Sequence, residues 1–264
     1  MTRIEMRVMA FGLAVVAIVA IATRLNEIRA RQTTGYLPVT DERLRDPEPD
    51  SWLMDRRTYD GWGYSPLDQI TEQNVSDLTP VWVFRTGVFG EHYQSPPIVN
   101  GDTMFLTTGS HVIALDAKSG ELRWRYAREL PSDVRIAHPT NRGVGLYADM
   151  VYVGTLDAHV VALNATTGQV VWDRAVENHK SGYYITMAPL IADGKVMVGT
   201  SGGERGVRGF VTALDAMTGD EVWKTFTIPA PGEPGSETWP ADSWRTGGGP
   251  VWVTGTHDPA RNLV

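Results

Sequence analysis

Residues 114–124 read ALDAKSGELRW, and the chain contains two near-copies of this stretch. The copies are ALNATTGQVVW at residues 162–172 and ALDAMTGDEVW at residues 213–223, so the closing tryptophans are 48 and 51 residues apart. In each copy an apolar strand end leads into a tight turn of Asp or Asn with Ser/Thr-Gly, and the tryptophan lies on the next strand. Repeats of about 40–50 residues with this character predict a β-propeller.

The rest of the chain after residue 50 is also patterned as short strands and turns. No long segment with a helical period appears after residue 32, so we expect an all-β fold. A weaker first repeat surrounds Trp82, and a further one begins at residues 250–256. We therefore expect about four blades, the N-terminal portion of a larger propeller whose closure needs a missing C-terminal half.

Composition excludes several classes of function. The net charge is −7 and no cysteine is present among the 264 residues. An acidic chain lacks the clustered Lys and Arg that phosphate contacts need, which argues against a nucleic-acid partner. The lack of cysteine excludes thiol catalysis, cysteine-ligated metals and disulfides.

The N-terminus predicts export. Arginines precede an apolar run at residues 8–22, which is short for a membrane span and ends in small residues. We interpret residues 1–22 as a cleaved signal peptide or, alternatively, as a short uncleaved membrane anchor. Residues 23–50 are polar and are expected to form a linker or an arm on the surface, and residues 51–264 form the repeat domain.

The sequence SGGERGVRG at residues 201–209 is the first candidate site. It places four glycines around Glu204. Glycines allow a backbone to approach a flat ligand and to present bare N–H groups, and a carboxylate among them can bind a hard cation. The alternative is a Gly-rich hairpin that carries an ordinary solvated glutamate.

A long Pro-rich excursion at residues 229–240 leads to a glycine triplet at residues 247–249. Loops of this length in compact domains are functional or disordered. Trp239, Trp244 and Trp252 lie near the triplet and suit a pocket wall that stacks on a planar ligand, although blade packing would explain them equally well.

Five motifs together resemble the methanol/ethanol family of PQQ-dependent alcohol dehydrogenases. The likeness runs from about Trp52 to Val264. The motifs are YSPLDQI at 64–70, NRG at 141–143, SGGERGVRG at 201–209, PGEPGSETWP at 231–240 and GGG at 247–249.

This resemblance implies an exported, periplasmic, eight-bladed propeller that holds pyrroloquinoline quinone (PQQ) and a Ca²⁺ ion on its axis. Such enzymes oxidise alcohols by hydride transfer to the quinone, with the metal as Lewis acid, and pass electrons to a cytochrome c-type acceptor. Carried onto this chain, the resemblance makes Glu204 a metal ligand and places Trp252 under the quinone ring. The expected contacts to the cofactor's carboxylates and edge are Arg142, Thr186, Ser201, Gly202 and Gly203.

Two departures from the family alter the expected cofactor site. Ile136 and Ala137 stand where the alcohol dehydrogenases have a disulfide over the quinone. His138 stands four residues before Arg142, as does a ring-stacking histidine in related membrane-bound glucose dehydrogenases. Our hypothesis is that His138 covers the upper ring face, the alternative being a histidine in a surface turn. Gln94 falls where the family has a cofactor-binding glutamate, although a plain loop residue is an alternative.

A third departure lies at the C-terminal end of the chain. The family's metal-ligating asparagine and catalytic aspartate would come after Val264, so the 264 residues alone are expected to be inactive, and Ca²⁺ and a lanthanide are both compatible with them. The competing interpretations are a non-catalytic propeller scaffold and a truncated product without a stable fold. The Gly-Gly-Glu loop combined with Arg142 favours the enzyme, because a scaffold has no use for a cation ligand beside an anion-binding arginine.

Overall fold

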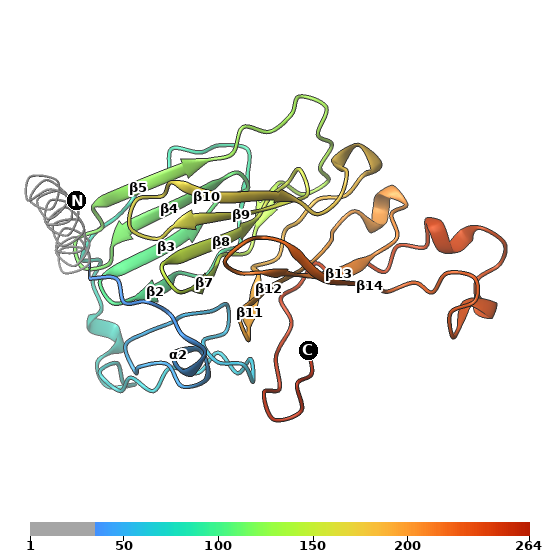
Figure 1. Cartoon of the computed structure of the whole chain (residues 1–264). Helices are drawn as coiled ribbons and strands as arrows, with labels where there is room; N and C mark the ends of the chain where they lie inside the picture. The colour runs from blue at the N-terminus through green and yellow to red at the C-terminus, as the bar shows by residue number, and fades with distance from the viewer. Residues whose placement is uncertain (1–34) are drawn as a thin grey trace, which may run out of the picture.

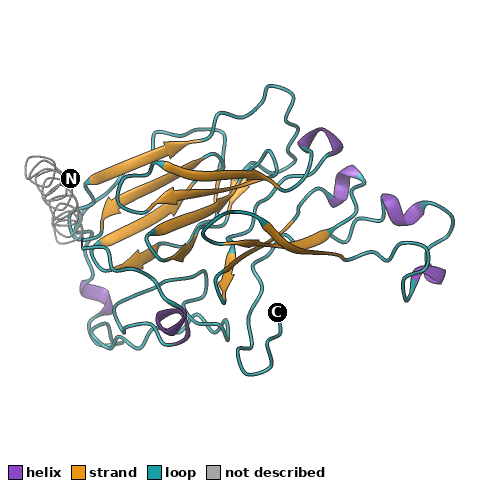
Figure 2. Cartoon of the chain, viewed as in Figure 1, coloured by secondary structure: helices purple, strands orange, loops and turns teal. Residues whose placement is uncertain are grey.

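The computed structural model describes residues 35–264. The signal peptide or anchor expected at residues 1–22 and the first part of the expected linker lie outside the described residues. Within residues 35–264, no helix is long and apolar enough to cross a membrane. Strands make up most of the regular secondary structure of this part of the chain, the helices are short, and loops connect them (Figure 2).

Residues 35–264 form three antiparallel four-stranded sheets that succeed one another along the chain (Figure 1). Each is a meander of consecutive strands, as expected for propeller blades. The first sheet contains β2 (Ile98–Asn100), β3 (Thr103–Thr107), β4 (His111–Asp116) and β5 (Leu122–Ala127). The second contains β7 (Gly145–Tyr147), β8 (Met150–Gly154), β9 (His159–Asn164) and β10 (Val170–Ala175). The third contains β11 (Leu190–Ala192), β12 (Lys195–Gly199), β13 (Phe210–Asp215) and β14 (Glu221–Phe226).

The remaining elements are small. Two short strands, β1 (His92–Tyr93) and β6 (Thr140–Asn141), pair in parallel. One α-helix, α2 (Asp41–Arg45), lies in the N-terminal segment. The 3₁₀ turns are Val75–Asp77, His179–Ser181, Gly203–Arg205, Ser236–Thr238 and Ser243–Arg245.

The repeated phrase forms the turn between the third and fourth strands of each sheet. In the first sheet the Asp116 carboxylate accepts hydrogen bonds from the backbone N–H groups of Lys118 and Ser119 at 3.0 and 2.9 Å. Asn164 and Asp215 make the equivalent pairs of bonds in the other two sheets. This side-chain turn explains why Asp or Asn recurs at that point in every copy.

Trp124 and Trp172 each pack on the turn of the next sheet. The Trp124 indole donates to the Ala165 carbonyl at 2.9 Å, and the Trp172 indole donates to Ala216 at 3.0 Å. A Cβ added at Gly168 would lie 2.6 Å from the Trp124 ring, so the close approach of the ring requires glycine. The repeat therefore encodes contact between neighbouring blades as well as the turn itself.

The two ends of this series differ. Trp82 contacts the first sheet in the same way: its indole donates to the Ala117 carbonyl at 3.3 Å, and its ring lies against Gly120. Trp223, on β14, is 36% exposed, whereas Trp124 and Trp172 are 8% and 7% exposed. Trp82 thus makes the contact that the tryptophan of a preceding blade would make with the first sheet. Trp223 is more exposed because no described turn packs against its ring.

Two segments expected as strands are not strands in the structure. Residues 81–84 and residues 250–256 have no assigned strand, and both Val81 and Val83 are exposed. A strand needs a neighbour for its backbone hydrogen bonds, and none of the described residues pairs with these segments. Strand-forming residue types alone cannot supply that partner.

The segment expected as a linker or surface arm is packed from residue 36 onward. Tyr36, Val39 and Leu44 are buried in the core, and Val39 forms an isolated bridge with Ala148 of the second sheet. The segment is mostly polar, so its composition did not predict that these three apolar residues pack against the sheets and hold the N-terminal segment there (Figure 1).

An ion pair in the same segment should make the free energy of unfolding depend on pH in the acid range. A hydrogen bond from Arg43 holds the pKa of Glu48 at about 2, below its usual 4.5. Because the folded-state pKa is depressed, the stabilisation is present above about pH 4.5 and is lost as the pH falls toward 2. We expect Glu48→Gln to lower the free energy of unfolding at pH 7, by less than about 1 kcal/mol because the carboxylate is partly exposed. Urea unfolding should show the difference vanishing near pH 2, and a difference that persists there would contradict this assignment.

Candidate functional site

A cavity of about 620 Å³ is lined by the segments around β1 and β6, by the loops that follow β10 and β12, and by residues 248–252. All nine residues predicted to bind the cofactor or metal line it. The structure thus brings together Gln94, His138, Arg142, Thr186, Ser201, Gly202, Gly203, Glu204 and Trp252.

The parallel pair β1 and β6 brings Gln94 to the cavity. His92 is opposite Thr140 and Tyr93 is opposite Asn141, so the next residues on the two segments are Gln94 and Arg142. Asn141 is buried and holds this turn through hydrogen bonds, its amide donating to the Gly154 carbonyl and its oxygen accepting from the Gly143 N–H, both at 2.8 Å. The asparagine of the NRG motif therefore supports the arginine beside it.

The Arg142 guanidinium has no ion pair with any described residue. It donates one long hydrogen bond of 3.4 Å to the Thr186 carbonyl, and it lies 4.8 Å from the centre of the Trp252 ring. Burial lowers the pKa of Arg142, and the negative charge of Asp55 partly opposes this shift. A partly desolvated cation with most of its donors free is suited to binding an anion.

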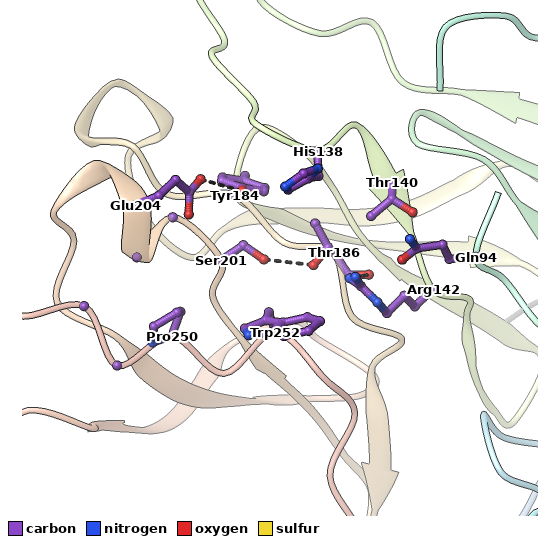
Figure 3. Close-up of a pocket in the computed structure, with 14 residues that line it drawn as sticks. Gln94, His138, Thr140, Arg142, Tyr184, Thr186, Ser201, Glu204, Pro250 and Trp252 are labelled. Carbon is purple, nitrogen blue, oxygen red and sulfur yellow. Dashed lines mark hydrogen bonds between the residues drawn. The ribbon is translucent and has the colours of Figure 1, made fainter. Parts of the chain in front are cut away.

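The hydroxyls of Thr186 and Ser201 meet on one side of the cavity, 2.8 Å apart, and both residues are buried (Figure 3). Next to them, Gly202 has a φ of +106°, and a Cβ there would lie 2.3 Å from the Gly182 carbonyl oxygen. Only glycine fits this position, which explains one glycine of the SGGERGVRG motif.

Glu204 lies in the 3₁₀ turn Gly203–Arg205, at one end of the cavity (Figure 3). Its Oε1 accepts a hydrogen bond of 2.7 Å from the Tyr184 hydroxyl. Burial and this bond to a carboxylate raise the pKa of Tyr184, so the phenol stays protonated and remains a donor at neutral pH.

His138 and Trp252 lie on opposite sides of the cavity (Figure 3). Trp252 is 47% exposed, unlike Trp124 and Trp172, which are buried between blades. The spacing of the sequence left open whether Trp252 belongs to a pocket or to blade packing, and its position favours the pocket. The other two tryptophans of that segment do not line the cavity: Trp239 packs against Gly247, and Trp244 packs against Arg208 and Arg245.

Residues 52–264 match the family described as glucose/ethanol/alcohol dehydrogenase, β-propeller domain, of the PQQ type. The chain belongs to the family of PQQ-dependent quinoprotein alcohol dehydrogenases. The match begins at Trp52, where the resemblance of the motifs begins, and it confirms both the family and the partial propeller predicted from them.

Relatives of this quinoprotein chain are longer than it is. The quinoprotein alcohol dehydrogenase PedH of Pseudomonas putida is 40% identical over 247 residues, covering 85% of this chain and 41% of PedH. The lanthanide-dependent methanol dehydrogenase of Methylacidiphilum fumariolicum is 36% identical over 249 residues, covering 84% of this chain and 41% of that enzyme. The structure of quinohemoprotein alcohol dehydrogenase ADHIIG from Pseudomonas putida superposes with a TM-score of 0.77 at 38% identity, covering 84% of this chain and 35% of that one.

The described residues fit a quinone cofactor of this family. PQQ is a flat polyanion, and the cavity offers two opposed ring-bearing side chains, a guanidinium without an ion pair, two buried hydroxyls and a backbone that a Cβ would obstruct. Fewer of the described residues are suited to bind a metal ion than to bind the quinone. Among residues 35–264 no group of three or more His, Asp or Glu side chains is placed to hold an ion, and Glu204 is the one carboxylate that lines the cavity. The described part of the chain thus offers one carboxylate to a hard cation in this cavity.

Sequence reasoning missed five residues that line the quinoprotein cavity. Thr140 and Tyr184 each lie two residues before a predicted contact, as does Pro250 before Trp252, so the two-residue spacing of an extended backbone was the available signal. The missed residues are Thr140, Tyr184, Gly248, Gly249 and Pro250.

Proposed function

We propose that this chain is the N-terminal part of a periplasmic enzyme that oxidises alcohols with PQQ and a metal ion. The observation that carries the proposal is the assembly of all nine predicted residues, from segments as distant as Gln94 and Trp252, around a single cavity. A non-catalytic scaffold would have no reason to keep a cation without an ion pair and a carboxylate in such a cavity.

Each described residue has a role in this proposal. Arg142 pairs with a carboxylate of the cofactor, and the Thr186 and Ser201 hydroxyls donate to its edge. Trp252 and His138 enclose the ring plane and exclude water from its faces. When bound, PQQ supplies the acceptor for the hydride of the alcohol, and the metal polarises the quinone carbonyl.

Glu204 contributes one carboxylate ligand to the metal. A hard oxygen donor suits Ca²⁺ and suits the larger trivalent cations equally. The lanthanide-dependent methanol dehydrogenase among the relatives makes a lanthanide a real alternative to Ca²⁺ here. The remaining metal ligands and the base that takes the alcohol proton come, in this proposal, from outside the 264 residues, because no further carboxylate of the described residues lines the cavity.

In this proposal a cytochrome c-type protein would serve as the electron acceptor of the enzyme. The export signal expected at residues 1–22 supports the periplasm as the compartment, with an anchor in the inner membrane as the alternative. A fusion of residues 1–40 to a reporter enzyme that is active only in the periplasm tests this assignment. An inactive reporter would contradict it.

Dye reduction with PQQ, Ca²⁺ and a series of small alcohols tests the activity. We expect PQQ binding by the purified 264 residues but no turnover, and turnover by a version that carries the remainder of the propeller. Failure of the longer version with Ca²⁺ and with lanthanum would overturn the proposed function. Turnover by the 264 residues alone would show that they hold the base.

His138 provides a separate test of the cofactor site. If His138 covers the quinone, His138→Ala should weaken PQQ binding about tenfold, the value of one aromatic contact of about 1.4 kcal/mol. Quenching of tryptophan fluorescence during PQQ titration measures the affinity. His111, at the start of β4 and outside the cavity, supplies the control: His111→Ala should leave the affinity unchanged. Equal affinities for wild type and His138→Ala would make His138 an ordinary turn residue.

A further inference from the structure

Tyr184 makes two hydrogen bonds to the Gly-rich segment at residues 201–204. Its carbonyl accepts a hydrogen bond from the Ser201 N–H at 2.7 Å. Its hydroxyl donates to Glu204 Oε1, also at 2.7 Å (Figure 3). The residue is buried, although it lies on the wall of the cavity. Its backbone is therefore anchored to the Gly-rich segment, and its hydroxyl is delivered to the carboxylate.

Glu204 has few restraints of its own. It lies in a single 3₁₀ turn between Gly202 and Gly206, both in the left-handed region, and its side chain is exposed. Of its two carboxylate oxygens, Oε1 is bonded to Tyr184, while Oε2 accepts no hydrogen bond from any described residue. The phenol is thus the described contact that sets the direction of this side chain.

The chemistry of the pair suits a cation ligand. A phenol donates one hydrogen bond and occupies one carboxylate oxygen, so the other oxygen keeps its lone pairs for a metal ion. Groups that hydrogen-bond a metal ligand orient it before the ion arrives, and removing them commonly costs about 10- to 100-fold in affinity. Tyr184 is buried and has only two side-chain torsions, so little freedom is lost in holding this geometry.

We propose that Tyr184 is a positioning residue for the metal site: it holds Glu204 Oε1 so that Oε2 faces the cavity. This inference rests on the proposed function, in which Glu204 binds the metal. It adds a residue that contacts the ligand rather than the ion, and it makes the affinity for the metal depend on a phenol hydroxyl.

Tyr184→Phe tests the proposal because it removes only the hydroxyl. The protein to use is the version that carries the remainder of the propeller, loaded with PQQ and titrated with Ca²⁺ by calorimetry. Tyr184→Phe should raise its Ca²⁺ dissociation constant about tenfold, the low end of the 10- to 100-fold range, because Glu204 is exposed. PQQ affinity measured without metal should stay within about twofold of wild type. If both affinities fall together, Tyr184 shapes the cavity in general and the proposal is overturned.

Tyr183 is a matched control in the adjacent position. Its hydroxyl bonds the backbone of Arg208 and lines no part of the cavity, so Tyr183→Phe should leave the Ca²⁺ dissociation constant unchanged. In a Glu204→Gln background, Tyr184→Phe should have no additional effect, because the two residues act on one ligand. Additive losses in the double variant would overturn the inference.

Failure of the inference and failure of the proposed function give different results. If Glu204→Gln binds Ca²⁺ like wild type, Glu204 is not a ligand, and the roles of Glu204 and Tyr184 are both overturned, whereas the proposed alcohol oxidation falls only if the longer version shows no turnover. If Glu204→Gln loses Ca²⁺ while Tyr184→Phe retains wild-type affinity, the metal site stands and only the role of Tyr184 is overturned.

Discussion

Replacing Arg142 with glutamine should weaken PQQ binding about 100-fold or more. Arg142 is a partly buried cation that has no ion pair with a described residue, so in the proposed complex its charge is balanced by a carboxylate of the cofactor. Truncating one member of such a desolvated charge pair costs roughly 2–5 kcal/mol, and about 2.7 kcal/mol corresponds to 100-fold. Calorimetric titration with PQQ in metal-free buffer isolates this contact from any effect of the metal.

Arg205 is the matched control for Arg142. It is an exposed arginine next to Glu204 that does not line the cavity. Arg205→Gln removes the same charge from the same region and should change PQQ affinity by less than about threefold, as expected for a screened surface charge. If the two variants bind PQQ equally well, Arg142 does not bind the cofactor's carboxylate.

Replacing Arg128 with methionine should lower the free energy of unfolding by about 3–5 kcal/mol, the cost of breaking a buried ion pair. Arg128, just after β5, donates to the Asp157 carboxylate at 2.7 Å and also pairs with Asp173 on β10, so it joins the first two sheets. The Asp157 side chain is only 4% exposed. Removing Arg128 leaves a buried carboxylate without its arginine, with the Thr155 hydroxyl still donating to it, and losing such a partner is among the costliest single changes in a protein.

The pH dependence of this loss can be derived from the pKa of Asp157. Burial raises that pKa, but hydrogen bonds from Arg128 and Thr155 outweigh burial and hold it below the ordinary value. The stabilisation is therefore present above about pH 4 and is lost as Asp157 becomes protonated at lower pH. Urea unfolding should show the Arg128→Met deficit at pH 7 and a smaller one at about pH 3.

Arg174 provides the comparison for Arg128. Its guanidinium is half exposed and lies 3.6 Å from Asp220 on the surface. Arg174→Met should cost less than about 1 kcal/mol, because an exposed ion pair is screened by water. If Arg128→Met and Arg174→Met lower the free energy of unfolding by the same amount, the buried ion pair stabilises the protein no more than an exposed one does.

The blades could be predicted because their signals are local. The turn of residues 114–124 is specified by an aspartate that bonds two backbone N–H groups of the turn and by a glycine at a positive φ. The second and third copies have the same residue types and therefore form the same turn. The strands on either side of each turn pair with each other, with their side chains alternating between the two faces of the sheet. The Gly-rich loop with Glu204 was visible for a similar reason, since glycine recurs where a backbone approaches closely.

Residues 81–84 show where local pattern fails. Their β-branched and aromatic residues are typical of a strand, but a strand requires hydrogen bonds from a neighbour, and no described segment supplies them. The segment after residue 36 shows the opposite case, in which polar sequence predicts a surface arm but the structure packs the chain against the sheets. Tyr36 and Leu44 lie in a mostly polar segment of the sequence, and only their contacts with the sheets show that they belong to the core.

The amino-acid order alone determined the strand–turn–strand repeats, the family and the residue types of the site, because turn geometry and side-chain alternation depend on neighbours in the chain. Tertiary structure decided which of these groups meet. Parallel pairing of β1 with β6 brings Gln94 to the cavity with Arg142, and the packing of Tyr184 delivers its hydroxyl to Glu204. These contacts depend on how whole sheets are placed against one another, and hydrogen bonds between distant segments have no periodicity that a sequence could display.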